Sequence, residues 1–355
     1  GSAFLGLREV FKERPHLAGY VQALYTTLPQ HTSSRYMHPS PGLMDKNPSA
    51  VAETLDALSS SLIHTVTLRS PPSPQYSASD WSRLPLEAQN AFYPIFAKPN
   101  LQTLVIHGLS IPKSFFREFG GLKHLKLLDV SWVWESPGVQ PQSRLDEVQK
   151  LASVDIGRLQ QPMALNTMTP EIGLDLGGVD HAKWWLSLPL KATPQLFPLN
   201  PEKLRAFEVR VFNEGWAPTT TVVQPLDLSS CCNLSQLTIS DDGSSYEYWL
   251  NSSWVAETLS SLPLPNRIHS LVLKYEGSEI GQYSSVRLLR PALSRLWACS
   301  KDIHVLIKIE LGIDSDTDDP EDEDAKLKDY VFNQVKWDGC ESALQVDVSR
   351  TSCFS

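Results

Sequence analysis

The sequence lacks the features that would place it in several large classes of protein. No apolar run reaches the roughly 18 residues that a membrane-spanning helix requires. Basic residues are in deficit, because 31 Lys and Arg stand against 40 Asp and Glu, and the formal net charge is −9. Since nucleic-acid-binding domains carry basic patches, we expect neither a membrane span nor a nucleic-acid partner.

Cysteine is scarce, and its spacing matches no known framework. The five cysteines are odd in number and do not follow a disulfide pattern. Cys231 and Cys232 are adjacent, but no His or further Cys lies beside them at the spacing of a zinc site. No secretory signal peptide is recognisable. We therefore expect a cytoplasmic or nuclear protein without a metal site.

The motifs of common catalytic sites are missing as well. There is no nucleophile elbow, no zinc-protease motif, no phosphate-binding loop and no dinucleotide-binding glycine motif. Residues 314–324 include eight acids and no base, but an EF-hand loop needs glycine where Asp319 stands and glutamate where Ala325 stands. We expect an acidic loop at 314–324, and no cofactor, metal or catalytic residue.

What the sequence does contain is a repeat. Two segments align at an offset of 21 residues and share the pattern Leu-x-x-Leu-x-Φ-x-x-Φ-Ser, in which Φ is an apolar residue. The matched positions are Leu101, Leu104, Ile106, Leu109 and Ser110 in the first segment and Leu122, Leu125, Leu127, Val130 and Ser131 in the second. This pattern indicates a leucine-rich repeat, which is a short strand followed by a helical return.

The apolar spacing returns along the chain, with strand units at 204–211, 234–239 and 268–273. We expect about nine such units, separated by 21 to about 42 residues, a wider range than that of regular leucine-rich repeats. The pattern also predicts strands at 16–25, 172–176, 303–311 and 344–348. It predicts helices at 3–14, 144–151, 182–190, 256–262, 285–298 and 326–335.

The predicted fold class is α/β. We expect an irregular leucine-rich-repeat solenoid that spans 1–355 as a single domain, with parallel strands on the concave face and helices on the convex face. Residues 3–26 would form an N-terminal cap helix and the first strand.

Side chains alternate along a strand, so every second strand residue should point away from the core, onto the concave face. Aromatic residues gather just after several strands, where they would form a rim, and Trp and Tyr are common at binding hot spots. The candidate binding residues on face and rim are Arg69, His107, Lys126, Trp132, Trp134, Glu208, Arg210, Phe212, Trp216, Ser240, Lys274, Tyr275 and Lys308. Because exposed charges contribute little to stability, we expect Lys126→Glu and Arg210→Glu to weaken binding without changing thermal stability.

The chain resembles the F-box-type leucine-rich-repeat proteins of mushroom-forming fungi. The resemblance covers most of the chain loosely and lies in the segments that begin at His16, Leu84, Pro99 and Gly121. It implies a repeat domain that selects substrates for ubiquitylation. No F-box pattern precedes His16, so the resemblance implies a Skp1-like adaptor only if an F-box lies upstream.

We therefore expect a non-catalytic protein-interaction module whose partner is another protein. One alternative is a small-molecule sensor with a loop-lined aromatic pocket near Trp132, Trp184 or Trp216. A second alternative is an enzyme on a repeat scaffold, which would need titratable residues to converge, such as Asp175, Asp180, His181 and Glu208.

Overall fold

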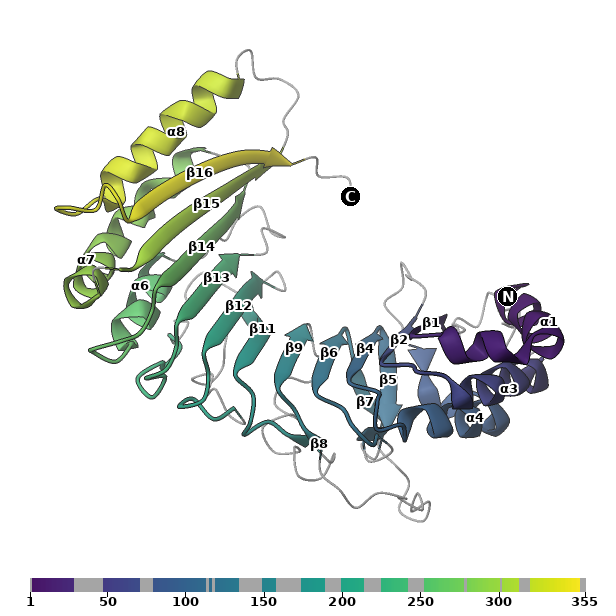
Figure 1. Cartoon of the computed structure of the whole chain (residues 1–355). Helices are drawn as coiled ribbons and strands as arrows, with labels where there is room; N and C mark the ends of the chain where they lie inside the picture. Colours follow the sequence, from purple (N-terminus) through teal and green to yellow (C-terminus); the bar gives the residue numbers. More distant parts are fainter. Residues whose placement is uncertain are drawn as a thin grey trace. The chain divides into compact units, whose positions relative to one another are not determined.

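The computed structural model describes residues 2–28, 47–70, 79–112, 115–116, 119–133, 149–157, 174–188, 199–213, 225–241, 252–277, 280–300, 302–312 and 320–351. The chain divides into two compact units, Gly1–Gly178 and Val179–Ser355. Each unit combines helices with a large parallel β-sheet (Figure 1). The predicted α/β class is confirmed.

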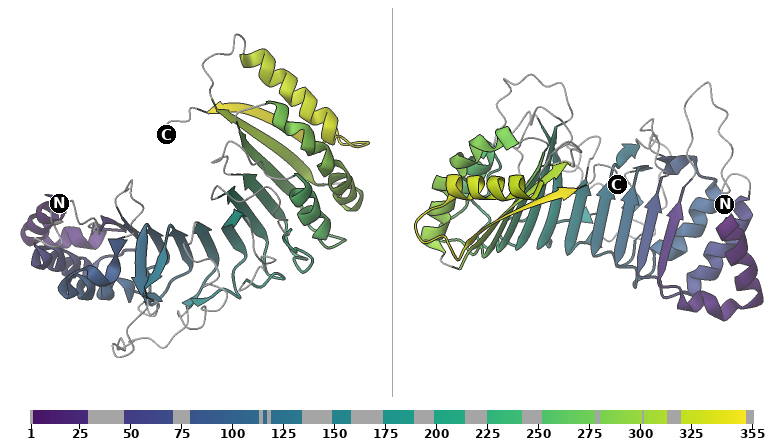
Figure 2. Two further views of the ribbon diagram at one scale, coloured as in Figure 1. Left: turned by 180° about the vertical axis from the view of Figure 1, so that it is seen from behind. Right: turned by 90° about the horizontal axis from the view of Figure 1, so that it is seen from above.

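The main sheet of the first unit contains strands of five residues each. In order across the sheet they are β1 (Ala23–Thr27), β2 (Thr65–Arg69), β4 (Thr103–His107), β6 (His124–Leu128) and β9 (Ser153–Gly157). Neighbours run parallel, as both views of Figure 2 show. The pairing of β4 with β6 joins residues 21 apart, such as Leu104 with Leu125. The offset of the sequence repeat is therefore also the register of this strand pair.

The first unit contains a second parallel sheet, and the chain turns a corner into it after β4 and after β6. Its order is β3 (Ser79–Asp80), β5 (Leu109–Pro112) and β7 (Ser131–Val133). The corner residues Gly108 and Asp129 both have positive φ, 68° and 51°, and they are again 21 residues apart. Glycine and aspartate tolerate this left-handed conformation better than most residues. A two-stranded sheet of β8 (Gln149–Lys150) and β10 (Leu174–Asp175) completes the described strands of this unit.

The helices of the first unit stack upon one another. They are α1 (Ser2–Glu13), α3 (Pro48–Ala57) and α4 (Leu86–Phe96), with 3-10 turns η1 (Pro15–Tyr20), η2 (Leu58–Ser60) and η3 (Trp81–Arg83). Side chains of η3 and α4 join three later phenylalanines in an aromatic cluster. Neighbouring ring centroids in it are 4.7–6.3 Å apart, and its members are Trp81, Phe92, Tyr93, Phe96, Phe115, Phe116 and Phe119. Aromatic pairs at such spacing add to the stabilisation from buried area.

The main sheet of the second unit has longer strands. In order they are β11 (His181–Leu188), β12 (Ala206–Asn213), β13 (Gln236–Asp241), β14 (Ser270–Gly277), β15 (His304–Gly312) and β16 (Leu344–Thr351). Strands β12, β13 and β14 pair at offsets of 30 and then 34 residues, as predicted. The helices α6 (Ser252–Ser261), α7 (Arg290–Cys299) and α8 (Pro320–Val335), with the 3-10 helix η5 (Ile280–Leu289), lie on one side of β13–β16 (Figure 1).

The two units share a pattern of backbone hydrogen bonds at the start of several strands. The carbonyl oxygen of the residue before one strand accepts hydrogen bonds from two consecutive N–H groups at the start of the adjacent strand. His64, Gln102 and Lys123 do so in the first unit, and Asp180, Arg205 and Ser235 in the second, with N···O distances of 2.8–3.2 Å. Because backbone groups lacking a partner are costly to bury, this ladder fixes the starts of β4, β6, β9, β12, β13 and β14 against their neighbours.

Several predicted elements are wrong. Residues 182–190 were expected to be helical, but 181–188 form strand β11, because Ala182 and Trp184 alternate with Lys183 and Trp185 in a period of two. The predicted helix at 144–151 gives way to the short strand β8 at 149–150; residues 144–148 lie outside the described part. The predicted strand at 172–176 is only β10, outside the main sheet.

Two further predictions need new boundaries. The first strand begins at Ala23, because Pro15–Tyr20 forms a 3-10 helix in its place. The acidic loop at 314–324 is wrong in its second half, since 320–324 form the first turn of α8. Proline at the first helical position and acids in the first turn both favour a helix start. Residues 314–319 lie outside the described part.

Candidate functional site

The candidate site is the open face of each main sheet, meaning the side of the strands opposite the buried apolar residues. In β12, for example, Phe207, Val209 and Val211 are buried, while Glu208 and Arg210 are half-buried on the opposite side. The predicted alternation is therefore confirmed here. The open-face residues align in cross-strand rows, because the strands pair in register.

The middle row of the first unit includes an internal ion pair. It reads Tyr25, Thr67, Val105, Lys126 and Asp155 across β1 to β9. Lys126 Nζ lies 2.9 Å from Asp155 Oδ2. The Lys126 charge is thus partnered within the sheet rather than presented alone.

The next row of the first unit holds the other two candidate residues. Arg69 is exposed and pairs in register with His107 on β4. His107 Nε2 lies 3.3 Å from Asp129 Oδ2, the carboxylate of the corner residue. A corner aspartate therefore serves both the left-handed turn and a contact with the open face.

The second unit repeats the ion pair. Lys183 on β11 and Glu208 on β12 face each other in register, with Nζ 2.7 Å from Oε1. Two residues further along, Arg210 lies over the ring of Trp185, with its guanidinium carbon 4.7 Å from the ring centroid. Opposite charges and cation–π contacts across neighbouring strands contribute fractions of a kcal/mol to about 1 kcal/mol each.

These contacts contradict the premise that Lys126 and Arg210 are exposed charges without contacts of their own. Both are held by partners on the neighbouring strand. Lys126→Glu would place a carboxylate beside Asp155, and Arg210→Glu would remove the stack on Trp185. Both substitutions are now expected to lower thermal stability.

Lys274 and Lys308 differ from the other open-face cations. They face each other in register on β14 and β15. Neither forms an ion pair within the described part of the chain, although both are half-buried. Their row continues from Arg210 through Ser240 on β13 to Asp347 on β16. Ser240 is only 3% exposed, and its hydroxyl donates to the Val209 carbonyl at 3.4 Å.

The aromatic rim is corrected at one position. Tyr275 is 2% exposed and lies on β14 on the same side as Leu271 and Leu273, so it belongs to the core. Trp132 and Phe212 lie on β7 and β12, but their side chains are outside the described part. Trp134 and Trp216 lie entirely outside it. Trp184, proposed for an aromatic pocket, is 8% exposed on the core side of β11.

Each of the four titratable residues of the enzyme alternative has a polar contact of its own. Asp175 lies on β10, where its carboxylate accepts the Gly177 N–H at 2.8 Å. Asp180 and His181 contact each other at 2.6 Å and are well exposed, and Glu208 is paired with Lys183. Among the described residues, no group of three or more His, Cys, Asp or Glu is placed to hold a metal ion.

Basic side chains also close helix ends, which the sequence did not reveal. Lys98 Nζ donates to the carbonyl oxygens of Leu58, at 3.1 Å, and Ser61, at the end of η2. Burial lowers the pKa of Lys98. Arg295 on α7 similarly donates to the carbonyls of Ser260 and Leu262 at the end of α6. Cations suit the partial negative charge of a helix C-terminus.

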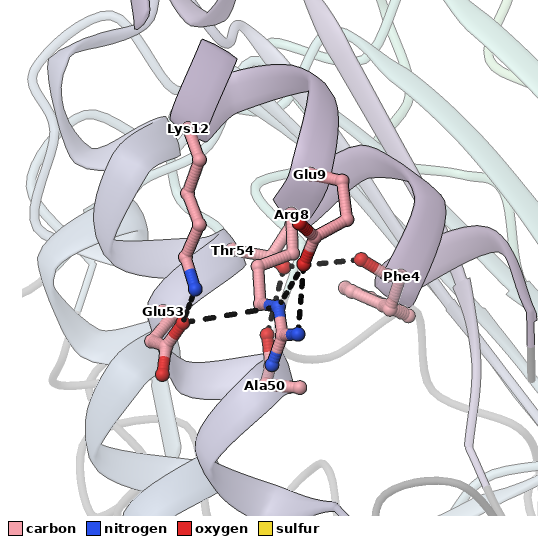
Figure 3. Close-up of polar contacts among 7 residues, drawn as sticks. All are labelled: Phe4, Arg8, Glu9, Lys12, Ala50, Glu53 and Thr54. Carbon is pink, nitrogen blue, oxygen red and sulfur yellow. Dashed lines mark hydrogen bonds and ion pairs between the residues drawn. The ribbon is translucent and has the colours of Figure 1, made fainter.

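The N-terminal helix is joined to α3 by polar contacts (Figure 3). Lys12 Nζ lies 3.1 Å and Arg8 Nε 3.9 Å from the same Glu53 oxygen. The hydroxyl of Thr54 donates to Phe4 O at 3.3 Å and to Ala50 O at 2.7 Å. The contacts of Lys12, Arg8 and Phe4 link α1, part of the predicted cap at residues 3–26, to α3.

Comparison with protein-family models, with curated proteins and with solved structures returned no match. Within the described part of the chain, no helix is long and apolar enough to cross a membrane.

Proposed function

We propose that this chain is a leucine-rich-repeat solenoid that acts as a non-catalytic protein-interaction module, and that its partners bind the open sheet face. The observation that carries the proposal is the repetition of one unit. Strand pairing, corner residues and the carbonyl ladder recur at the offsets of the apolar pattern. Repeat proteins of this kind use extended sheet faces for binding.

The proposed partner is another protein. The open face mixes aliphatic, hydroxyl and charged side chains, as protein interfaces do, and the net charge of −9 disfavours nucleic acid. The resemblance to F-box-type repeat proteins supports a role in selecting substrates for ubiquitylation in the cytoplasm or nucleus. Recruitment of a Skp1-like adaptor is part of the proposal only if an F-box lies upstream.

Quantitative capture from a cell lysate with matched variants tests the proposal. Val105→Arg places a bulky charge in the middle row of the first unit. Val272→Arg places one on the open face of the second unit, between Thr238 and Leu306. Glu87→Lys and Lys328→Glu change exposed residues of α4 and α8. Thermal unfolding should first show that all four variants fold.

The proposal predicts that at least one specifically enriched protein is lost with an open-face variant and retained with both helix variants. Loss with the helix variants alone would contradict the open face as the binding surface. Equal recovery with all variants, or no specific enrichment, would also count against it.

A further inference from the structure

We infer that the open face of β13–β15 recognises an acidic segment of the partner protein through Lys274 and Lys308. The inference rests on the proposed function and specifies the chemistry of the ligand. The open-face lysines differ in their neighbours on the adjacent strand. Lys126 and Lys183 are each neutralised by a carboxylate on the next strand, at 2.9 Å and 2.7 Å, whereas Lys274 and Lys308 are paired in register with each other.

Two ammonium groups directly opposite on neighbouring strands repel each other, and this destabilises a sheet. Strands are about 5 Å apart, so both charges lie within reach of one carboxylate or of two carboxylates on an extended segment. Such a ligand would convert the repulsion into two charge-assisted hydrogen bonds. The site would therefore gain electrostatic stabilisation on binding.

Among the described side chains, neither Asp347 nor Glu310 supplies this partner. Asp347 is in register with Lys308, but its Oδ1 accepts a hydrogen bond from Gln345 Nε2 at 2.9 Å. Glu310 lies two residues beyond Lys308 on the same face, and neither it nor Asp347 forms an ion pair with the two lysines. These two acids border the Lys274–Lys308 pair, which favours a ligand with few, well-placed carboxylates.

The neighbouring row favours aliphatic side chains in the ligand. Val272 and Leu306 are half-buried and paired in register, two residues before the lysines. Arg210, stacked on Trp185, adds a third cation to the lysine row on the other side of Ser240. The complementary ligand is an extended peptide with acidic side chains over the lysine row and aliphatic side chains over the Val272–Leu306 row. With a formal net charge of −9, the chain as a whole repels such a peptide, so binding must come from these local charges.

Selection from a library of random dodecapeptides displayed on phage tests the inference. The wild-type chain should select peptides enriched in Asp and Glu flanked by aliphatic residues. One selected peptide is then measured by fluorescence anisotropy against the wild type, Lys274→Gln/Lys308→Gln and a control pair, Lys123→Gln/Lys328→Gln. Both control lysines are exposed and lie outside the row, so the two variants lose the same charge.

The inference predicts a loss of affinity of about tenfold or more for Lys274→Gln/Lys308→Gln and little change for the control. It predicts a similar loss when the peptide's Glu and Asp are replaced by Gln and Asn. Selected peptides without excess acids, or equal binding to all three proteins, would overturn it. The proposed function would still stand if lysate capture remained sensitive to Val105→Arg or Val272→Arg, so the two failures are distinguishable.

Discussion

Gly108 marks the corner between β4 and β5, and its φ of 68° makes it a sensitive residue. A Cβ at this position would lie 3.0 Å from Ser70 Cβ, in addition to the strain of the left-handed backbone. Gly108→Ala should lower the free energy of unfolding by about 1–3 kcal/mol. In Gly6→Ala, the added methyl group meets nothing within 4 Å on α1, and helix propensity should leave stability equal or slightly higher. Chemical denaturation of both variants measures the difference; equal effects would contradict the corner's special conformation.

The adjacent thiols Cys231 and Cys232 should differ in reactivity. Burial raises the pKa of Cys231 to about 12, whereas Cys232 is exposed. Only the thiolate attacks alkylating reagents, so Cys231 stays protonated and inert at every pH well below its pKa. Alkylation of the native protein at pH 8, followed by peptide mass spectrometry, should label Cys232 and spare Cys231. Labelling of both thiols at the same rate would contradict the buried position of Cys231.

At the scale of elements, the strands that carry the repeat could be predicted and those between them could not. Leu104 and Leu125 belong to matching patterns, and that match gave the register of β4 and β6 in advance. Strand β11 was mistaken for a helix because Ala182, Trp184 and Leu186 do not distinguish the two periods in so short a run. The charge partners of the site were also missed, since Lys126–Asp155 and Lys183–Glu208 become neighbours only once the strand offsets, 29 and 25 residues, are known.

A buried repeat leucine supports a strand through packing. Leu237 on β13 is 1% exposed, and Leu237→Ala should destabilise the protein by about 2–5 kcal/mol, because it leaves a cavity. Thr238→Ala, on the open face of the same strand, is the matched control and should cost far less. Denaturant unfolding curves decide between them, and a neutral Leu237→Ala would disprove the assigned face.

The ends of η2 and α6 are held by basic side chains that lie later in the sequence. Lys98→Met keeps the aliphatic stem but removes the donors to the Leu58 and Ser61 carbonyls. We expect a loss of about 1–3 kcal/mol in unfolding free energy, because the Ser61 carbonyl loses this donor. The Leu58 carbonyl still accepts from the N–H and hydroxyl of Ser61. Lys328→Met, at an exposed position of α8, should be nearly neutral. Hydrogen exchange at the end of α3 and η2 should rise in Lys98→Met alone; unchanged exchange would show that the contact does not cap the helix.

At the scale of the whole molecule, two α/β units present sheet faces built from the same repeating device. The backbone ladder occurs in both units, and the described corners belong to the first. Open-face residues such as Val105 and Val272 lie outside these contacts. Function is therefore expected where substitution costs the fold least. The composition argued only against a nucleic-acid partner. The difference between lysines with and without an ion pair among the described residues required the register of the strands.

The central claim, that partners bind the open face, is tested most directly by site-specific photocrosslinking. A photoreactive phenylalanine analogue at Thr67 or Val272 would report on the open faces, and the same group at Glu87 or Lys328 on the helix side. Irradiation in a cell lysate should join one dominant protein to the open-face positions and none to the helix positions. Crosslinks to that protein from the helix positions alone would contradict the account.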